Sequence, residues 1–396
     1  MRIQYLLLLS MFIRVVTHNI WTNNKIKPRL YKIIKNRNSF KIMLSHKNNN
    51  NQTDQTDQTD QTEETAKEKK IIKHIVLAGG GAMGFAFYGA LRESCYKEIW
   101  KQEDIETIYG TSIGTILSVF LSLGYDWNVL DDFIIKRPWQ NVFKFQLPMA
   151  LNVITKQGIF DRSTINDIFL PLFKGKDIPI DINLLDFYHL TKREIHFITT
   201  ELNQMETEDI SYKTHPEWKV LDAVYASCCL PFLFSPFYYE TPVSDSKGGD
   251  RESTSGVSGL MTRKQAFIDG GMLMNFPLNL CLSAGHDPRE VLAIRRINEK
   301  EDNEEVFHPK NTLFEIAFSL ILKLIAKIEE PVVVQEIGYH IDIENSIYNL
   351  YSYIYNCIYS EDARKTLIEL GVRCVRPPLT IVESEDIDKD LTEEKL

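Results

Sequence analysis

Ser112 lies in a setting typical of a catalytic nucleophile. It is the central residue of a G-x-S-x-G pattern, Gly110-Thr111-Ser112-Ile113-Gly114, between an expected strand and an expected helix. A serine on so sharp a turn needs small residues two positions before and after it, which the two glycines supply. The dipole of the following helix would favour an anion at the turn. Because the pattern also arises by chance, a helix-capping serine is the alternative interpretation.

A nucleophilic serine needs a base, and none of the nine histidines lies in a persuasive setting for that role. The better candidate is Asp269, which ends an apolar run and is followed by Gly270 and Gly271. On spacing alone, an aspartate in a turn explains this motif equally well. The distinctive continuation of the loop over residues 272–277 favours the catalytic interpretation.

A glycine-rich turn precedes both motifs along the chain. It consists of Gly79, Gly80, Gly81, Ala82, Met83 and Gly84. The turn fits G-x-G-x-x-G, the fingerprint of dinucleotide binding, but it also suits a loop that directs backbone N–H groups at the oxyanion of a reacting ester. An acidic residue about 20 positions further on would support the dinucleotide interpretation, and Glu98, Glu103 and Asp104 meet that condition. That interpretation leaves Ser112 and Asp269 without a role.

Taken as a set, the three blocks resemble those of the patatin-like phospholipases, lipid acyl hydrolases that use a Ser/Asp dyad. Residues 79–84 resemble the family's oxyanion loop, residues 110–114 its nucleophile elbow and residues 269–271 its aspartate motif. The resemblance covers roughly residues 71–297. Three further segments within it match family motifs in the same order: Gly158–Asp161, Phe197–Asn203 and Ala226–Pro236. In one departure, Met83 stands where the family commonly has Arg or Lys, which bears on anion preference and catalytic rate.

The resemblance implies hydrolysis of a fatty-acyl ester through an acyl-enzyme. Ser112 would be the nucleophile, Asp269 the base, and the N–H groups of Gly80 and Gly81 the oxyanion donors. The implied substrate is a phospholipid or lysophospholipid at a membrane surface, and no metal or cofactor is implied. Two alternatives are a catalytically weak, lipid-binding member of the same fold and, less favoured, an oxidoreductase that binds a dinucleotide at residues 79–84.

Alternating strands and helices would position these motifs. Strands are expected at residues 71–78, 105–109, 194–200 and 291–297, and helices at residues 85–99 and 115–123. The alternation predicts an α/β fold with a mainly parallel central sheet flanked by helices, the three-layer arrangement of patatin-like proteins. In such a sheet the turns after the first two strands emerge at the same edge.

Composition divides the chain into segments with different expected roles. Residues 1–47 hold ten Lys and Arg and no acidic residue, which is typical of a membrane anchor or a targeting segment; a spurious extension before Met43 is the alternative. The polar repeat in residues 48–70 predicts a disordered linker. Residues 71–300 are expected to form the patatin-like catalytic domain. Residues 301–378 are expected to form a helical extension packed on it, with an apolar helix at residues 313–328, and residues 379–396 an acidic tail.

Charge and cysteine content restrict the partners. Residues 48–396 hold all 54 acidic residues but only 35 of the 45 basic ones, which argues against nucleic acid as a partner. Six cysteines without C-x-x-C spacing predict free thiols in a reducing compartment, with a cytoplasmic location and peripheral membrane association. Residues 241–264 are expected to form a long loop that offers a site for a protein activator or a ligand. The sequence leaves the oligomeric state open.

Overall fold

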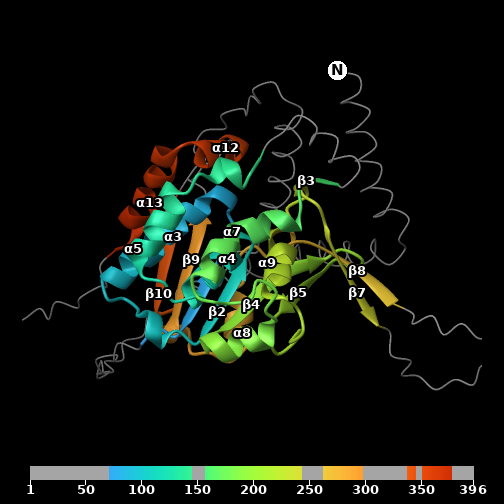
Figure 1. Ribbon diagram of the computed structural model, residues 1–396. Coiled ribbons are helices and arrows are strands. Elements are labelled where there is room, and N and C mark those ends of the chain that lie inside the picture. The colour runs from blue at the N-terminus through green and yellow to red at the C-terminus, as the bar shows by residue number, and fades with distance from the viewer. Residues whose placement is uncertain (1–70, 145–156, 243–261, 298–336, 345–349, 377–396) are drawn as a thin grey trace, which may run out of the picture.

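Runs of β-branched and aliphatic residues form one central sheet in the computed structural model of the protein, which describes residues 71–144, 157–242, 262–297, 337–344 and 350–376 (Figure 1). The strands of this sheet are β1 (His74–Leu77), β2 (Thr107–Thr111), β4 (Glu194–Glu201), β5 (Glu206–Ile210), β7 (Phe237–Pro242), β8 (Thr262–Asp269), β9 (Val291–Ile297) and β10 (Tyr339–Glu344). They follow the order β10-β9-β1-β2-β4-β8-β7, and β5 also pairs with β4. Because β10, β9, β1, β2 and β4 run parallel, the predicted mainly parallel sheet is confirmed.

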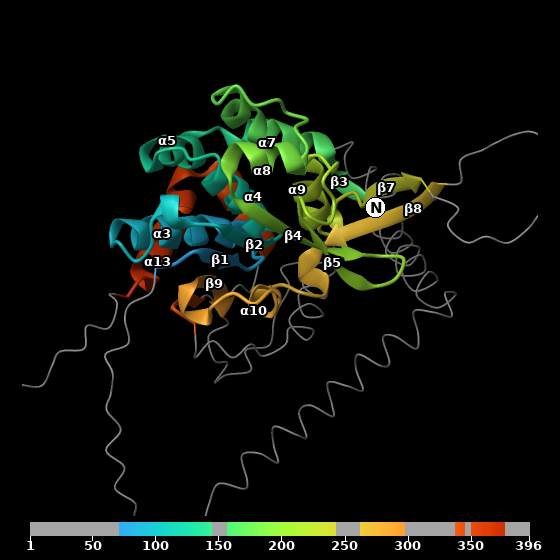
Figure 2. The same ribbon diagram turned by 90° about the horizontal axis from the view of Figure 1, so that it is seen from below.

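Helices cover both faces of this sheet (Figure 2). They are α3 (Gly84–Tyr96), α4 (Ile113–Ser122), α5 (Trp127–Asp131), α7 (Arg162–Lys174), α8 (Leu184–Thr191), α9 (Val220–Cys228), α10 (Leu278–Ser283), α12 (Leu350–Tyr359) and α13 (Glu361–Cys374). Single turns of 3-10 or π type are η1 (Gly81–Met83), η2 (Gln102–Asp104), η3 (Asp132–Lys136), η4 (Trp139–Asn141), η5 (Gly270–Met272) and η6 (Pro288–Glu290). A separate parallel pair joins β3 (Gly158–Phe160) to β6 (Phe232–Phe234). None of the described helices is both long and apolar enough to cross a membrane.

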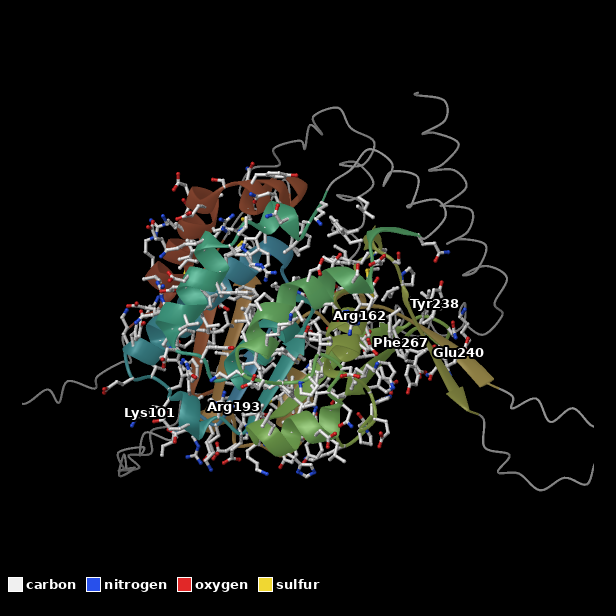
Figure 3. All side chains as sticks on the ribbon, in the orientation of Figure 1. Lys101, Arg162, Arg193, Tyr238, Glu240 and Phe267 are labelled. Atoms are coloured by element: carbon white, nitrogen blue, oxygen red, sulfur yellow. The ribbon has the colours of Figure 1, made fainter. Side chains whose placement is uncertain are left out.

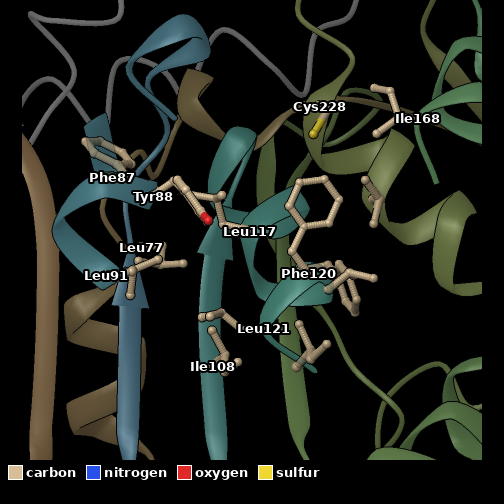
Figure 4. Packing of buried hydrophobic residues seen from close by; sticks show 14 of the residues in the cluster. Leu77, Phe87, Tyr88, Leu91, Ile108, Leu117, Phe120, Leu121, Ile168 and Cys228 are labelled. Carbon is tan, nitrogen blue, oxygen red and sulfur yellow. The ribbon is translucent and has the colours of Figure 1, made fainter. Parts of the chain in front are cut away.

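The side chains of β1 show how the layers are built, because successive residues of a strand point to opposite faces. Leu77 packs into the larger core with Leu91 of α3 and Leu117 of α4 (Figure 4). Its neighbour Val76 belongs to a smaller core on the other face, where it packs with Leu278 of α10. All of these side chains are almost completely buried. The three-layer α/β arrangement expected from the family resemblance is therefore present.

Strand β8 reaches the end of β2 along one edge of β4. Thr111, the last residue of β2, pairs with Ile198 of β4, and Asp269, the last residue of β8, pairs with the next residue, Thr199. Strand β5 pairs with this same part of β4, so it occupies the opposite edge. Strands β2 and β8 therefore lie end to end, and the residue that follows β2, Ser112, is brought to the end of β8.

The loop expected at residues 241–264 is shorter at both ends than its composition indicated. Strand β7 continues to Pro242 and β8 begins at Thr262, because the two strands pair with each other as an antiparallel ribbon. This ribbon extends away from the rest of the sheet and carries Tyr238 and Glu240 (Figures 1 and 3). The intervening residues 243–261, where an activator or ligand was expected to bind, lie outside the described residues.

The C-terminal region contributes a strand as well as helices. Residues 301–378 were expected to form a helical extension, and within them β10 pairs with β9 and extends the central sheet. The reason is visible in the alternation of Tyr339, Ile341 and Ile343, the last two of which are buried. Helix α13 then packs on α3, where a Cβ atom at Gly371 would lie 1.8 Å from the carbonyl oxygen of Ala86. The expected apolar helix at residues 313–328 and the segments 1–70 and 379–396 lie outside the described residues.

Candidate active site

Ser112 occupies a sharp turn between β2 and α4. Its φ angle of 53° lies in the left-handed region, which is unusual for a residue with a side chain. The turn leaves no room at the two flanking glycines. A Cβ atom at Gly110 would lie 2.8 Å from the carbonyl carbon of Gly114, and one at Gly114 would lie 2.6 Å from the carbonyl oxygen of Leu77. The strand–turn–helix context that a nucleophile elbow requires is therefore present around Ser112.

Asp269 lies next to the serine at the end of β8. Its Oδ2 atom accepts a hydrogen bond of 2.6 Å from Oγ of Ser112, and its Oδ1 atom accepts one of 2.8 Å from the N–H of Gly271. The aspartate is 4% exposed. Burial raises the pKa of the Asp269 carboxyl to about 6, although both hydrogen bonds act in the opposite direction. A carboxyl group with such a pKa can exchange a proton near neutral pH.

The glycine-rich turn after β1 lies directly against the elbow. A Cβ atom at Gly79 would stand 3.3 Å from Cβ of Ser112. The N–H of Gly79 donates to the carbonyl oxygen of Asn275 (2.9 Å), and Nδ2 of Asn275 donates back to the carbonyl oxygen of Gly79 (3.4 Å). These two hydrogen bonds fasten the turn to the segment that follows Asp269, so all three sequence blocks converge at one place.

Only part of the turn keeps N–H groups available to a ligand. Three of the six positions expected to form an oxyanion hole direct their N–H groups to carbonyl groups of the protein instead: Gly79, Met83 and Gly84. In the described part of the chain, no hydrogen bond uses the N–H groups of the other three positions, Gly80, Gly81 and Ala82. The same holds for the N–H of Ile113, which opens α4 beside Ser112.

A model of the patatin-like phospholipase family matches residues 75–282, more than half of the chain. The chain belongs to that family. Family membership confirms the resemblance that the three blocks and their order had indicated. It favours the ester-hydrolase interpretation of residues 79–84 over the dinucleotide-binding one.

Known relatives of this patatin-like protein include viral proteins. An uncharacterized protein of Acanthamoeba polyphaga mimivirus is 24% identical over 256 residues, which are 64% of this chain and 76% of that protein. A probable lipid hydrolase of Invertebrate iridescent virus 6 is 23% identical over 215 residues, 54% of this chain and 64% of that protein, so the chain spans less than two thirds of it. The crystal structure of VipD from Legionella pneumophila is 15% identical, with a TM-score of 0.37 over 76% of this chain and 67% of VipD. The family assignment rests on the sequence match and not on this structural likeness.

Met83 stands where the family commonly has a basic residue. Its side chain is 0% exposed and belongs to the large core beneath the turn. The Cβ atom of Met83 and the ring of Phe87 both lie against Gly80. The patatin-like protein therefore uses this position to anchor the turn by apolar packing.

Among the described histidines of the patatin-like protein, His196 pairs with acidic residues other than Asp269. His196 of β4 contacts Oδ2 of Asp209 through Nδ1 (2.9 Å) and Oε1 of Glu194 through Nε2 (3.3 Å). In the part of the chain that the structure describes, no hydrogen bond joins a histidine to either member of the pair. The six cysteines carry free thiols, as their spacing predicted.

Two contacts at the site were not foreseen from the sequence. Asn275 holds the glycine-rich turn, and Oγ1 of Thr111 donates to the carbonyl oxygen of Met274 (3.1 Å). Both contacts involve residues 272–277, the distinctive continuation of the aspartate motif. The unusual sequence of residues 272–277 indicated that this segment belongs to the site, but it did not indicate which residues the segment would contact.

Proposed function

We propose that the protein is a serine lipid acyl hydrolase in which Ser112 and Asp269 act as a catalytic dyad. The observation that carries the proposal is the 2.6 Å hydrogen bond from Oγ of Ser112 to Oδ2 of Asp269, on an elbow of the kind that serine hydrolases use. Membership of the patatin-like phospholipase family supports an ester hydrolase on independent grounds.

Acylation follows from this arrangement. Oγ of Ser112 attacks the carbonyl carbon of a fatty-acyl ester while Asp269 accepts the hydroxyl proton. The oxyanion of the tetrahedral intermediate accepts hydrogen bonds from the N–H groups of Gly80 and Gly81, with Ile113 as a further donor. Collapse of the intermediate breaks the ester bond, and the leaving alcohol takes the proton from Asp269.

Deacylation repeats the same steps with water as the nucleophile. Asp269 accepts a proton from the attacking water, the oxyanion is held by the same N–H groups, and Ser112 leaves with the proton that Asp269 returns. The fatty acid is released and the free enzyme is restored. These steps use only the side chains and backbone groups at the site, so the proposed mechanism needs no metal or cofactor.

The proposed substrate is the acyl ester of a phospholipid or lysophospholipid at a membrane surface. The family description supports a lipid, and one relative is named a probable lipid hydrolase. Locally, the side chain of Ile113 lies against Gly84 and is partly exposed beside Ser112, which provides apolar surface at the reacting ester. A long acyl chain would gain free energy by covering such surface.

Labelling with a fluorophosphonate probe, which reacts with activated serines, tests the proposal directly. The full chain should be labelled at Ser112, and it should release fatty acid from phosphatidylcholine vesicles, measured by mass spectrometry. Ser112→Ala should abolish both signals, and Asp269→Asn should lower the rate of release by several orders of magnitude. The matched controls are Ser163→Ala and Asp126→Asn, which alter exposed residues and should leave both signals unchanged. Labelling that survives in Ser112→Ala, or full activity in Asp269→Asn, would refute the dyad.

A further inference from the structure

The backbone of Ser112 is held on both sides by two consecutive residues at the end of α9. The N–H of Ser112 donates to Oγ of Ser227 (2.9 Å), and Sγ of Cys228 donates to the carbonyl oxygen of Ser112 (3.1 Å). Ser227 is 0% exposed and Cys228 is 7% exposed. The peptide group before the proposed nucleophile is therefore held by a buried side chain from a different element. The carbonyl group after it is held by Cys228 together with Thr115 of α4, whose N–H (2.8 Å) and Oγ1 (2.7 Å) also donate to it.

The orientation of the Ser227 hydroxyl allows its oxygen to accept the hydrogen bond from the N–H of Ser112. A hydroxyl group has one proton to donate, and Ser227 donates it to the carbonyl oxygen of Ile198 in β4 (2.5 Å). Its oxygen lone pairs are therefore left to accept the N–H of Ser112. Since Ile198 is also the residue that pairs with the end of β2, the hydroxyl joins the elbow to the strand that sets its position.

The next residue in the same segment holds the other member of the proposed dyad. The carbonyl oxygen of Cys229 accepts a hydrogen bond of 3.1 Å from the N–H of Asp269. Oγ1 of Thr199 adds a cross-link, because it contacts the carbonyl oxygens of both Ala226 (2.7 Å) and Ile268 (2.9 Å). The segment 227–229 thus contacts the backbones of both Ser112 and Asp269.

We propose that Ser227 is a positioning residue that, together with Cys228 and Cys229, sets the placement of Oγ of Ser112 relative to the carboxylate of Asp269. The inference rests on the proposed function and goes beyond it by assigning a role to a segment that touches no substrate. The physical reason is the left-handed φ angle of Ser112. A residue in that region stays there only when its surroundings fix it, and the N–H bond to Ser227 is one of the contacts that do so.

Ser227→Ala removes the acceptor for the Ser112 N–H and lets the elbow relax. A displacement of about 1 Å at a reacting group can slow a reaction roughly 100-fold, so we expect kcat to fall about 10- to 100-fold while KM changes little. The acid limb of the pH–rate profile should also move to higher pH. The reason is that the hydrogen bond from Ser112 lowers the pKa of Asp269, and a looser bond would lower it less.

Ser94→Ala is the matched control. Ser94 is also 0% exposed, and its hydroxyl likewise accepts from an N–H, that of Trp100 (2.9 Å), while contacting the carbonyl oxygen of Ala90 (2.7 Å). It lies on α3, and in the described part of the chain its hydrogen bonds join it to Ala90, Leu91 and Trp100 and not to Ser112 or Asp269. The control should lose comparable stability yet keep the kcat and the pH profile of the wild type. If Ser227→Ala behaves like Ser94→Ala in kcat and pH profile, the inference is overturned.

Two further measurements keep the inference testable whatever the first variant does. If Ser227→Ala fails to fold, two variants of Cys228 take its place. Cys228→Ala should lower kcat, whereas Cys228→Ser, which keeps a donor for the Ser112 carbonyl, should recover most of it. Equal kcat values for the two variants would overturn the inference. Hydrogen exchange at the Ser112 amide should be faster in Ser227→Ala than in Ser94→Ala, and no difference would overturn it too. Because exchange needs no turnover, it decides the role of Ser227 even if the wild type proves inactive and the proposed function fails.

Discussion

Oγ of Ser112 lies 2.6 Å from Oδ2 of Asp269, although 157 positions separate the two residues in the chain. The two residues meet because β4 is longer than β2 and extends beyond its end. The end of β2 at Thr111 pairs with Ile198, and the end of β8 pairs with the very next residue, Thr199. The separation of the Ser112 hydroxyl and the Asp269 carboxylate is therefore set by strand register, and a slip of one residue in β8 would turn the carboxylate to the other face of the sheet.

The rate of hydrolysis should depend on pH through Asp269. Burial raises the pKa of its carboxyl to about 6, and only the ionised form can accept the proton of Ser112. We expect kcat/KM to rise about tenfold per pH unit below pH ~6 and to level off above it. A pH–rate profile on a short-chain ester between about pH 4 and 8 measures this limb. A midpoint near the ordinary aspartate value of about 3.9 would contradict the role given to burial.

The same buried carboxyl should lower the stability of the folded protein at neutral pH. Its folded pKa of about 6 lies above the ordinary value of about 3.9, so folding disfavours the charged form. This cost is absent below pH ~3, grows as the pH rises, and is complete above pH ~6. Asp269→Asn, which keeps an acceptor for the N–H of Gly271, should therefore raise the free energy of unfolding by up to about 3 kcal/mol near pH 7.5.

Urea denaturation at two pH values checks this prediction. The gain in Asp269→Asn should shrink to well under 1 kcal/mol near pH ~4 and vanish near pH ~3, where the carboxyl is protonated in both states. Asp126→Asn, on an exposed residue, should show no gain at either pH. A variant of Asp269 that is less stable than the wild type near pH 7.5 would mean that its hydrogen bonds outweigh its desolvation.

The local turns at the site could be predicted from the sequence because short contiguous motifs encode them. Gly110 and Gly114 are two residues from Ser112 on either side, and steric exclusion at those positions does not depend on the rest of the fold. The strand at residues 291–297 was likewise expected with the bounds it has. Turns and strand bounds of this kind can be predicted from neighbouring residues alone, without knowledge of long-range contacts.

The rest of the site depends on pairings that local patterns do not record. Nothing near Asp269 in the sequence says that β8 will end beside β2, since that outcome depends on how far β4 extends beyond β2. Nor does a serine at the end of α9 signal contact with the amide of Ser112, 115 positions earlier in the chain. Strand β10 is a different case, because the alternation of Ile341 and Ile343 with polar residues indicated a strand and was not used.

Introducing the basic residue that the family commonly carries should not improve this protein. Met83 is 0% exposed in the large core, so Met83→Arg would bury a guanidinium group among apolar side chains. We expect a loss of about 3 kcal/mol or more in the free energy of unfolding, with no gain in kcat. Met83→Leu conserves the volume and should lose less than about 1.5 kcal/mol. Thermal melting and ester hydrolysis measure both effects, and a stable Met83→Arg variant with higher activity would show that the turn can present this side chain to the site.

The histidine on β4 should make stability depend on pH in the opposite sense to Asp269. Burial lowers the pKa of His196, but its contacts with Asp209 and Glu194 outweigh burial and leave the pKa raised. The resulting stabilisation is complete below the ordinary histidine value of about 6.5 and is lost as the pH rises through the folded pKa. His196→Phe keeps a ring stacked on Tyr109 but removes both ionic contacts.

We expect His196→Phe to lower the free energy of unfolding by up to about 3 kcal/mol near pH 6, because Asp209 loses its contact with His196 while Glu194 keeps its ion pair with Lys213 (2.7 Å). The difference from the wild type should narrow as the pH is raised toward about 9. Urea denaturation across this range measures the difference directly. A constant difference would mean that His196 contributes through packing and neutral hydrogen bonds rather than through its charge.

Gly371 offers a test in which helix propensity and packing predict opposite signs. It lies inside α13, and replacing a glycine within a helix by alanine ordinarily stabilises the helix by about 1 kcal/mol. Here the new Cβ atom would stand 1.8 Å from the carbonyl oxygen of Ala86 and 2.9 Å from the N atom of Ala90, both in α3. Backbone atoms of a helix cannot move aside as a flexible side chain can, so Gly371→Ala should force α13 away from α3.

We therefore expect Gly371→Ala to lower the free energy of unfolding by about 1 to 3 kcal/mol, as overpacking of a core usually does. Thermal and urea denaturation of the full chain measure the change. Glu369→Ala, two positions away on an exposed part of the same helix, is the control and should change stability little. A more stable Gly371→Ala variant would show that α13 can shift without loss, and the close backbone contact would then not be what fixes the C-terminal helix to α3.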